Sequence, residues 1–360
     1  MFNIKDYGAV GDGVNNDLPA YKAMVAAVNA AGGGDVLFPP GVYFMDGYQR
    51  YNEVPATVVE PAFKLCTRLR VSGYGAKIDL RGNYHRSSAD DKHPITGLYF
   101  WKCKHFVVEG FEIDGNLDQM TRDANMIGET WSYGILTAGC SHYTIRDVDV
   151  HHHLTDGVLL GHLPAPNENN DEYALMLNVR SRYNGRQGLS LVGMKHFTAE
   201  NCDFSYTGRV EPYGGHAPGA GVDIEPEGAG AVAEDILFLN CRFHDNKGGN
   251  IGAGYATLTR RVTFRDCLVT YPASRGWEGN EHGVILYSED GVMDNCYLDL
   301  GHRNVYLSHG GPSTVARNTL RNCTIRSSRN GVATLHEAEA LVEGCRIIST
   351  ATAPTGEFPW

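Results

Sequence analysis

A short pattern that returns along the second half of the chain constrains the fold more than any other feature. In five segments alternating residues lead to Asn or Asp, then Cys, then another short strand: FTAENCDFSYT, ILFLNCRFHDN, VTFRDCLVTYP, GVMDNCYLDLG and NTLRNCTIRSS. Cys345 follows Gly in LVEGCRIIS, and the pattern continues upstream without Cys at Gly110, Val148 and Val179. The step from one equivalent position to the next ranges from 22 residues (323 to 345) to 39 residues (202 to 241).

This periodicity predicts a β-solenoid, in which each repeat forms one coil and stacks on the next. Asn and Asp tolerate the left-handed αL conformation and bond the local backbone, so each marks a sharp turn between two strands. We expect the Cys that follows to point inward as a small apolar core residue, with metal binding and disulfides as the alternatives. The nine cysteines are an odd number, which excludes a complete disulfide framework.

Each coil has a second strand that begins at a Gly or Asn and continues with an apolar residue that we expect to point inward. The markers are Gly97, Gly134, Gly157, Gly188, Gly221, Asn250, Gly283, Asn304 and Gly331. Since side chains alternate along a strand, Asp223 and Glu225 in AGVDIEPEG are predicted to point outward. In the same register Gly252 and Gly254 lie beside them, which leaves an open shelf next to two carboxylates.

The N-terminal segment has helical rather than strand spacing. Leu18, Tyr21, Met24, Val25 and Val28 recur on one helical face, with Asp17 as a predicted N-cap and GGG as the stop signal. This predicts a helix over about 17–31 in a cap of residues 1–45, followed by coils over about 60–350. No linker interrupts the chain, so residues 1–360 are predicted to form a single domain.

Charge and hydropathy narrow the partners. The net charge of −11 and the lack of a basic patch argue against nucleic acid. No apolar run reaches the length of a membrane span, and the N-terminus lacks the features of a signal peptide. We expect no membrane partner. Localisation is left open: extracellular or periplasmic if a leader was removed, otherwise cytoplasmic.

The opening KDYGAVGDGVNND…GGGDVLFPPGVY and the Asn-Cys coils resemble the pectate-lyase-like superfamily of right-handed parallel β-helix proteins. That superfamily holds polysaccharide hydrolases, lyases, C5-epimerases and tailspike depolymerases. The resemblance implies an all-β, single-stranded right-handed parallel β-helix of about ten coils with an N-terminal capping α-helix. It also implies a substrate groove along the Gly-marked strand, and it leaves a homo-oligomer of tailspike type open.

Asp223 and Glu225 are the candidate catalytic residues. Their Cα atoms are about 6.6 Å apart in a strand, so their carboxyl groups can reach both the retaining and the inverting glycosidase separations. Like charges raise one pKa, so that one acid stays protonated. We assign the acid to Glu225 and the base or nucleophile to Asp223, with swapped roles left open. The alternatives are a solvated sheet face and a site for calcium or another hard cation.

The remaining candidates are predicted to bind substrate. Three long turns rise beside the same strands, and ordered long turns are usually functional. The predicted substrate-binding residues are Trp131, Arg186, Ser190, Tyr213, His216, Glu227, Trp277, Glu278, His282 and Tyr287. No metal ligand is assigned and no cofactor is predicted to be required, although calcium is left open. The histidine run 151–153 is interpreted as solvated turn residues, because alternation prevents three consecutive side chains from meeting.

Three functions follow from these residues. The first is a glycoside hydrolase or transglycosylase that acts on an oligo- or polysaccharide through the carboxylate pair. The second is a uronate lyase or C5-epimerase: AGVDIEPE resembles the epimerase motif Tyr-Gly-Phe-Asp-Pro-His-Glu at Asp223. Ala220 and Glu225 replace the Tyr and His of that motif, however, so two proton-transfer groups are missing. The third is a non-catalytic glycan-binding solenoid.

Overall fold

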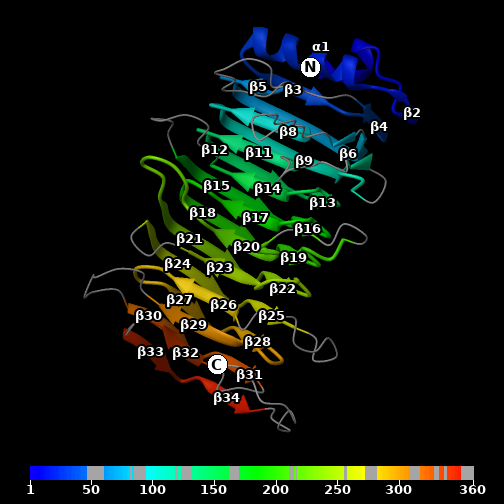
Figure 1. Cartoon of the computed structure of the whole chain (residues 1–360). Coiled ribbons are helices and arrows are strands. Elements are labelled where there is room, and N and C mark those ends of the chain that lie inside the picture. Colours follow the sequence, from blue (N-terminus) through cyan, green and yellow to red (C-terminus); the bar gives the residue numbers. More distant parts are fainter. Residues whose placement is uncertain are drawn as a thin grey trace.

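The structure is a computed structural model, and it describes most of the chain. The described residues are 1–46, 61–81, 83–84, 95–117, 121–122, 132–161, 170–210, 215, 217–254, 258–271, 282–308, 317–327, 332–335 and 339–349. Within them the chain forms an all-β right-handed parallel β-helix, as the sequence predicts. Figure 1 shows the strands stacked from helix α1 at one end to β34 at the other.

One ladder of the stack is a ten-stranded parallel sheet built from the Gly-marked strands. Successive strands pair in register, for example Val222 with Leu189 on one side and Ile251 on the other. Its strands are β5 (Phe63–Lys64), β8 (Ile95–Trp101), β11 (Ser132–Ala138), β14 (Asp156–Leu160), β17 (Gln187–Leu191), β20 (Ala220–Ile224), β23 (Ile251–Ala253), β26 (His282–Tyr287), β29 (Asn304–Ser308) and β32 (Val332–Leu335).

The other strands form two further ladders, which the long strands β6 (Thr67–Arg81) and β9 (Lys104–Asp114) join into one sheet. The ladder before the Asn turn contains β1 (Phe2–Asn3), β3 (Gly34–Leu37), β12 (Ser141–Arg146), β15 (Asp171–Leu177), β18 (Met194–Glu200), β21 (Ala233–Leu239), β24 (Thr259–Arg265), β27 (Val292–Asp294), β30 (Arg317–Arg321) and β33 (Glu339–Glu343). The ladder after it contains β2 (Asp12–Asn16), β4 (Gly41–Asp46), β13 (Asp149–His151), β16 (Arg180–Arg182), β19 (Asp203–Ser205), β22 (Arg242–His244), β25 (Leu268–Thr270), β28 (Tyr297–Asp299), β31 (Thr324–Ser327) and β34 (Arg346–Ser349). A separate pair joins β7 (Asn83–Tyr84) to β10 (Thr121–Arg122).

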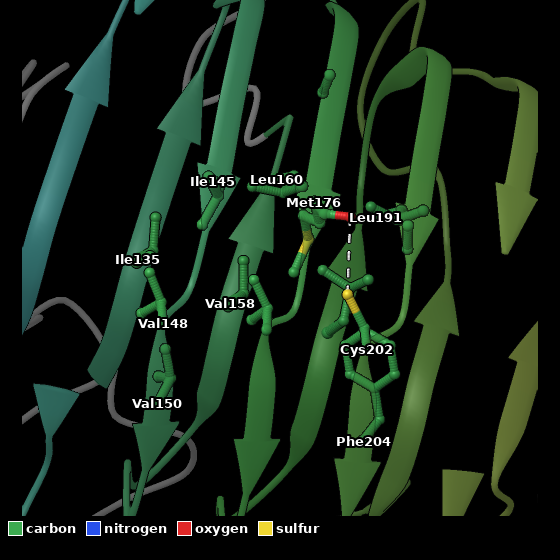
Figure 2. Packing of buried hydrophobic residues seen from close by; sticks show 14 of the residues in the cluster. Ile135, Ile145, Val148, Val150, Val158, Leu160, Met176, Leu191, Cys202 and Phe204 are labelled. Carbon is green, nitrogen blue, oxygen red and sulfur yellow. Dashed lines mark hydrogen bonds between the residues drawn. The ribbon is translucent and has the colours of Figure 1, made fainter. Parts of the chain in front are cut away.

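The core lies between the three ladders and repeats coil by coil. Figure 2 shows Ile135 and Val158 of the ten-stranded sheet near Val148 and Val150, with Cys202 Sγ facing the Met176 carbonyl at 3.8 Å. All nine cysteines are free thiols, and eight are buried. The prediction of small apolar core residues is therefore confirmed, and the disulfide alternative is wrong.

The sharp turns follow the predicted chemistry. The seven Asn and Asp residues that precede the repeated core position all have a positive φ: Asp147, Asn178, Asn201, Asn240, Asp266, Asn295 and Asn322. Gly344 stands at the same turn position, with φ of 61°. Gly110 does too, with φ of 80°, so its predicted equivalence to Val148 is wrong: Glu109 pairs with Arg146 and Glu112 with Asp149, which places Gly110 level with Asp147. These residues adopt αL at little cost, and the turn therefore repeats from coil to coil.

The N-terminal helix α1 (Leu18–Ala31) begins and ends close to the predicted bounds. A 3₁₀ turn, η1 (Ile4–Tyr7), precedes it, and Gly32 in αL ends it. Its five predicted apolar residues are all buried in the main core. Asp17 is the N-cap residue, as predicted, but its side chain makes no capping hydrogen bond. Its carboxylate instead accepts hydrogen bonds from the Val10 and Gly11 amides, while Asn16 Oδ1 accepts one from Leu18 N. Among the described residues, no helix has both the length and the apolar character to cross a membrane.

Candidate functional site

Strand β20 carries Asp223 on the outer surface of the ten-stranded sheet, and Glu225 follows directly after the strand. Val222 and Ile224 are fully buried in the core, so Asp223 points to the opposite side, as predicted. The register places Ser190 and Gly252 on either side of Asp223. The predicted side-chain directions on this strand are therefore confirmed.

Asp223 is much less exposed than the sequence indicates, since only 9% of the residue is accessible. Its Oδ2 accepts a hydrogen bond from Gln187 Nε2. Its Oδ1 faces the neighbouring glycine: a Cβ built on Gly252 would lie 3.2 Å from that oxygen. One oxygen is thus held by the protein, and the other lies over the glycine shelf.

A polar network leads away from Asp223 through the two preceding coils. Ser190 Oγ lies between Gln187 Oε1 and Asp156 Oδ2, the latter at 3.0 Å. Asp156 is fully buried and receives both Arg186 Nε (2.9 Å) and Arg186 Nη2 (2.6 Å) on its two oxygens. Such a bidentate guanidinium–carboxylate pair fixes both groups in one geometry. The network orients Gln187, which in turn holds Asp223.

These surroundings change the acidity of Asp223. Burial raises its pKa, and the carboxylates of Glu225 and Asp156 raise it further, while Arg186 lowers it; the result is a pKa of about 7. A carboxylic acid in an apolar or acidic environment keeps its proton to a higher pH because its charged form is disfavoured. Asp223 is therefore able to hold a proton near neutral pH.

Glu225 and Glu227 lie in a more open setting than Asp223. Glu225 follows the last residue of β20 and is partly exposed, and its amide donates to the Leu191 carbonyl. Glu227 is exposed, and its amide donates to the Val192 carbonyl. Gly254 lies next to Glu225, and a Cβ built there would meet only the Ile224 carbonyl, at 3.4 Å. Exposure to solvent therefore increases from the buried Asp223 to Glu225 and Glu227, and the adjacent surface at Gly252 and Gly254 has no side chains.

Of the predicted substrate-binding residues, Arg186 and Ser190 join Asp223 through the network, and Tyr287 is partly exposed in β26. His282 is the first residue of β26, and its side chain is not among those that the structure describes. Trp131, Tyr213, His216, Trp277 and Glu278 lie outside the described residues. Sequence reasoning missed Asp156 and Gln187 as members of the site. Register was the available signal, because Asp156, Gln187 and Ala220 occupy one row across β14, β17 and β20.

The histidine run departs from its predicted role. His151 is 6% exposed and His153 is fully buried, so the interpretation of these two as solvated turn residues is wrong. Burial lowers the pKa of His153 to about 3, and the neighbouring His151 adds to this effect. The backbone reverses at His152, whose φ is +56°.

The sequence matches a family model, the right-handed β-helix region, over residues 96–278. Among curated proteins, mannuronan C5-epimerase AlgE6 of Azotobacter vinelandii is 55% identical over 42 residues, which are 12% of this chain and 5% of that protein. The chain therefore matches only a small part of the length of this relative.

Solved structures resemble the fold along nearly the whole chain. The A-module of AlgE6 from Azotobacter vinelandii has a TM-score of 0.57 at 18% identity, covering 97% of this chain and 95% of that one. PfbA, a surface adhesin of Streptococcus pneumoniae, has a TM-score of 0.53 at 12% identity, with coverages of 97% and 92%. An exopolygalacturonase of Thermotoga maritima has a TM-score of 0.51 at 11% identity, with coverages of 97% and 91%. An epimerase, an adhesin and a hydrolase thus share this fold.

Proposed function

This chain belongs to the right-handed β-helix family, and we propose that it is a carbohydrate-active enzyme that cleaves an oligo- or polysaccharide as a glycoside hydrolase or transglycosylase. The observation that carries this proposal is the pairing of two different carboxyl groups at the end of strand β20, one within the strand and one directly after it. Asp223 is buried, with a pKa of about 7, and Glu225 two residues later is partly exposed. An acid whose surroundings raise its pKa, next to a second and more accessible carboxylate, is the usual arrangement for acid–base chemistry on a glycosidic bond.

The surroundings of Asp223 favour it as the proton donor. Gln187 Nε2 donates to Oδ2, so that oxygen accepts, and the acid proton is best placed on Oδ1. That atom faces Gly252, where the absence of a side chain gives a sugar oxygen room to approach. Glu225 then serves as the base or nucleophile. This assignment swaps the two roles that the sequence alone favours.

A uronate lyase or C5-epimerase is the second candidate, and the local similarity to AlgE6 favours it. Such chemistry needs a group that neutralises the substrate carboxylate and a base that removes the proton beside it. Among the described residues of this site, Arg186 offers the positive charge, but Asp156 already binds it through two hydrogen bonds. Ala220 and Glu225 stand where the epimerase motif has Tyr and His, which disfavours this candidate.

Product analysis on a panel of neutral glucans, pectate and alginate tests the proposal. Hydrolysis yields new reducing ends without unsaturated products, elimination yields ultraviolet-absorbing unsaturated ends, and epimerisation changes the uronate composition seen by NMR. Asp223→Asn and Glu225→Gln should each reduce turnover at least about 100-fold while circular dichroism stays unchanged.

Asp171→Asn is the matched control, because Asp171 is another fully buried acid, with a pKa raised to about 6 by burial. It lies at the start of β15, away from the outer surface of the ten-stranded sheet. Full turnover in both site variants would refute the catalytic assignment. Binding without turnover on every polysaccharide would favour the third candidate, a glycan-binding solenoid like the adhesin in fold.

Calcium stays a prediction for this site. The carboxylates of Glu225 and Glu227 are oxygen donors of the type that calcium prefers, although Asp223 binds a proton more readily than an ordinary aspartate. If calcium binds there, chelation should lower the melting temperature, and the shift should disappear in Glu225→Gln. An unchanged melting temperature after chelation would show that this site does not bind calcium.

A further inference from the structure

A second cluster of polar side chains, which takes no part in the proposed reaction, lies at a corner of the solenoid. It consists of Asp114 at the end of β9, His151 at the end of β13, and His152 in the turn that follows. One ligand atom from each of the three lies within 4.8 Å of the others. We propose that these residues bind a divalent transition cation of the zinc type, and that this site is separate from the carboxylates on β20.

The backbone explains why two consecutive histidines meet. Asp114 and His151 are direct partners in the parallel pairing of β9 with β13, so their side chains stand side by side. Continued strand geometry would turn His152 to the other side of the sheet. Because His152 adopts φ of +56°, the chain turns instead, and its ring meets that of His151. The predicted alternation of side chains fails here because His152 has a left-handed backbone conformation.

The distances suit one small cation. His151 Nδ1 lies 2.8 Å from His152 Nδ1 and 3.4 Å from Asp114 Oδ1. Ligands at about 2.0–2.2 Å from a tetrahedral zinc ion are separated from one another by about 3.3–3.6 Å. The 3.4 Å separation fits this geometry, whereas the 2.8 Å contact is a hydrogen bond between the two imidazole rings and has to lengthen by about 0.5 Å when an ion binds. Imidazole favours zinc and its neighbours over calcium or magnesium.

The groups behind the three ligands are arranged to orient them. His151 Nε2 faces Glu112 Oε1 at 3.4 Å, which is the carboxylate–histidine arrangement found behind metal-bound imidazoles. The backbone N–H of Asn116 donates a hydrogen bond to Asp114 Oδ1 at 2.9 Å. The His152 ring stacks on Tyr183 with centroids 5.3 Å apart and a 7° angle between planes. Each ligand is thus held from outside the cluster.

Two cationic side chains near the cluster, Lys77 and Arg182, oppose the cation. Arg182 is the direct partner of His151 in the pairing of β13 with β16 and binds Asp149. Lys77 Nζ lies 2.6 Å from Asp114 Oδ2 and 3.3 Å from Glu112. It takes Oδ2 of Asp114 and leaves Oδ1 toward the histidines. The Lys77 charge lowers the affinity of the site through repulsion, so we expect an exchangeable ion rather than a permanent one.

The cluster also has access to solvent. Asp114 and His151 are nearly buried, but His152 is partly exposed. Lys77 and Glu112 line an open groove of about 620 Å³ together with Asp149 and Arg180. Three protein ligands leave one coordination position free, as in zinc sites that exchange water or bind an external ligand.

Titration of the metal-free protein with Co²⁺ and Zn²⁺ tests the site. One equivalent should bind, with a Co²⁺ spectrum that lacks a thiolate charge-transfer band, and Zn²⁺ should raise the melting temperature. His152→Phe keeps the stack on Tyr183 but removes the ring nitrogens, and should weaken binding at least about tenfold. Asp114→Asn should have the same effect.

His142→Phe is the matched control. His142 also has φ of +56° and also stacks on a tyrosine, Tyr173, with centroids 4.7 Å apart. It should leave the metal affinity unchanged. The proposal is overturned if the wild-type protein binds neither ion, if His152→Phe binds as tightly as His142→Phe, or if a thiolate band places the ion on cysteine.

Discussion

The ten-stranded sheet presents two contrasting regions along a single row of outward side chains. In β8, β11 and β14 the row consists of Tyr99, Leu136 and Leu159, which belong to an apolar cluster outside the main core. In the next three strands the same row continues as Ser190, Asp223 and Gly252. Leu159, Ser190 and Asp223 are all buried to a similar degree, with 3%, 3% and 9% exposed.

The two regions share backbone, register and burial, so the difference between them is chemical. Apolar side chains gain free energy when they leave water, whereas a buried carboxyl costs free energy unless it is neutral or hydrogen-bonded. The second region accepts that cost and offsets part of it through the network from Arg186 to Asp223. Leucine side chains could have filled this row in all of these strands, but polar residues occupy the second region instead. Such a departure from apolar packing is expected at functional sites.

The largest expected effect comes from breaking the polar region at its base. Asp156→Asn removes the carboxylate that both Arg186 and Ser190 contact. Breaking a fully buried ion pair typically costs about 3–5 kcal/mol of unfolding free energy. Because the Arg186 side chain is 20% exposed and can reach water, we expect the lower end of that range, about 3 kcal/mol. Urea unfolding should show this loss, and turnover should fall as well, because Gln187 and Asp223 lose their support. A variant of wild-type stability would contradict the importance of the network.

The apolar region should respond in stability alone. Leu159 lies on β14, the same strand as Asp156, and Leu159→Ala should cost about 2–5 kcal/mol through lost burial and the cavity it leaves. Turnover per folded molecule should stay within about twofold of wild type. If turnover instead falls as far as in Asp156→Asn, the division of the row into a packing region and a catalytic region is wrong.

A pH series isolates the buried acid. In the folded protein the pKa of Asp223 is about 7, against 3.8 for an ordinary aspartate. The folded state therefore holds a proton that the unfolded chain releases, and this contribution to stability is full below about pH 4 and lost as the pH rises through about 7. The stability of the wild type relative to Asp223→Asn should fall over that window by at most about 4 kcal/mol.

Turnover should show an alkaline limb near pH 7 if Asp223 donates the proton. A flat stability difference between about pH 4 and pH 8 would show that Asp223 titrates normally and that the polar region is open to water.

The smallest expected effect comes from the glycine shelf. Gly252→Ala should change the unfolding free energy by less than about 1 kcal/mol, because the smaller loss of backbone entropy is opposed by a tight contact of the new Cβ. That Cβ would sit 3.2 Å from Asp223 Oδ1, where we place the substrate, so the apparent KM should rise. Gly254→Ala, at the other position of the shelf, meets only the Ile224 carbonyl at a looser 3.4 Å and should raise the KM less. Equal KM values for both variants and the wild type would remove the shelf from the site.

Much of the fold follows from local rules that the sequence states repeatedly. A turn residue that tolerates αL, a small inward residue (Cys in most coils, Val at 148 and 179) and alternating apolar residues recur from coil to coil, so the same prediction holds for many coils. The direction of Asp223 followed from Val222 and Ile224 for the same reason. The side chain of Asp17 escaped this reasoning because its carboxylate bonds amides six and seven residues earlier in the chain, which no capping rule anticipates.

The site was less predictable because its environment comes from other coils. The exposure of Asp223 depends on Gln187 and Ser190, which lie more than 30 residues earlier and are not unusual in their own strand. Gln187 and Ser190 come close to Asp223 only through the pairing of β17 with β20. The sequence of one strand alone does not show which residues of the next strand will contact it. His151 and His153 were wrongly predicted to be solvated. The rings of His151 and His152 meet for a more local reason, because one left-handed residue, His152, interrupts the alternation of side chains on which the prediction depended.

The thiols that fill the core give the molecule a set of internal reporters. The cysteines are spread from Cys66 to Cys345, and only Cys345 is partly exposed, so a thiol-reactive dye can label the other eight only when their surroundings open. The rate at which each position is modified, resolved by mass spectrometry, would chart local opening along the long axis of the molecule. Such a profile would tell whether the solenoid unzips from one end or melts as a unit, without the introduction of any probe.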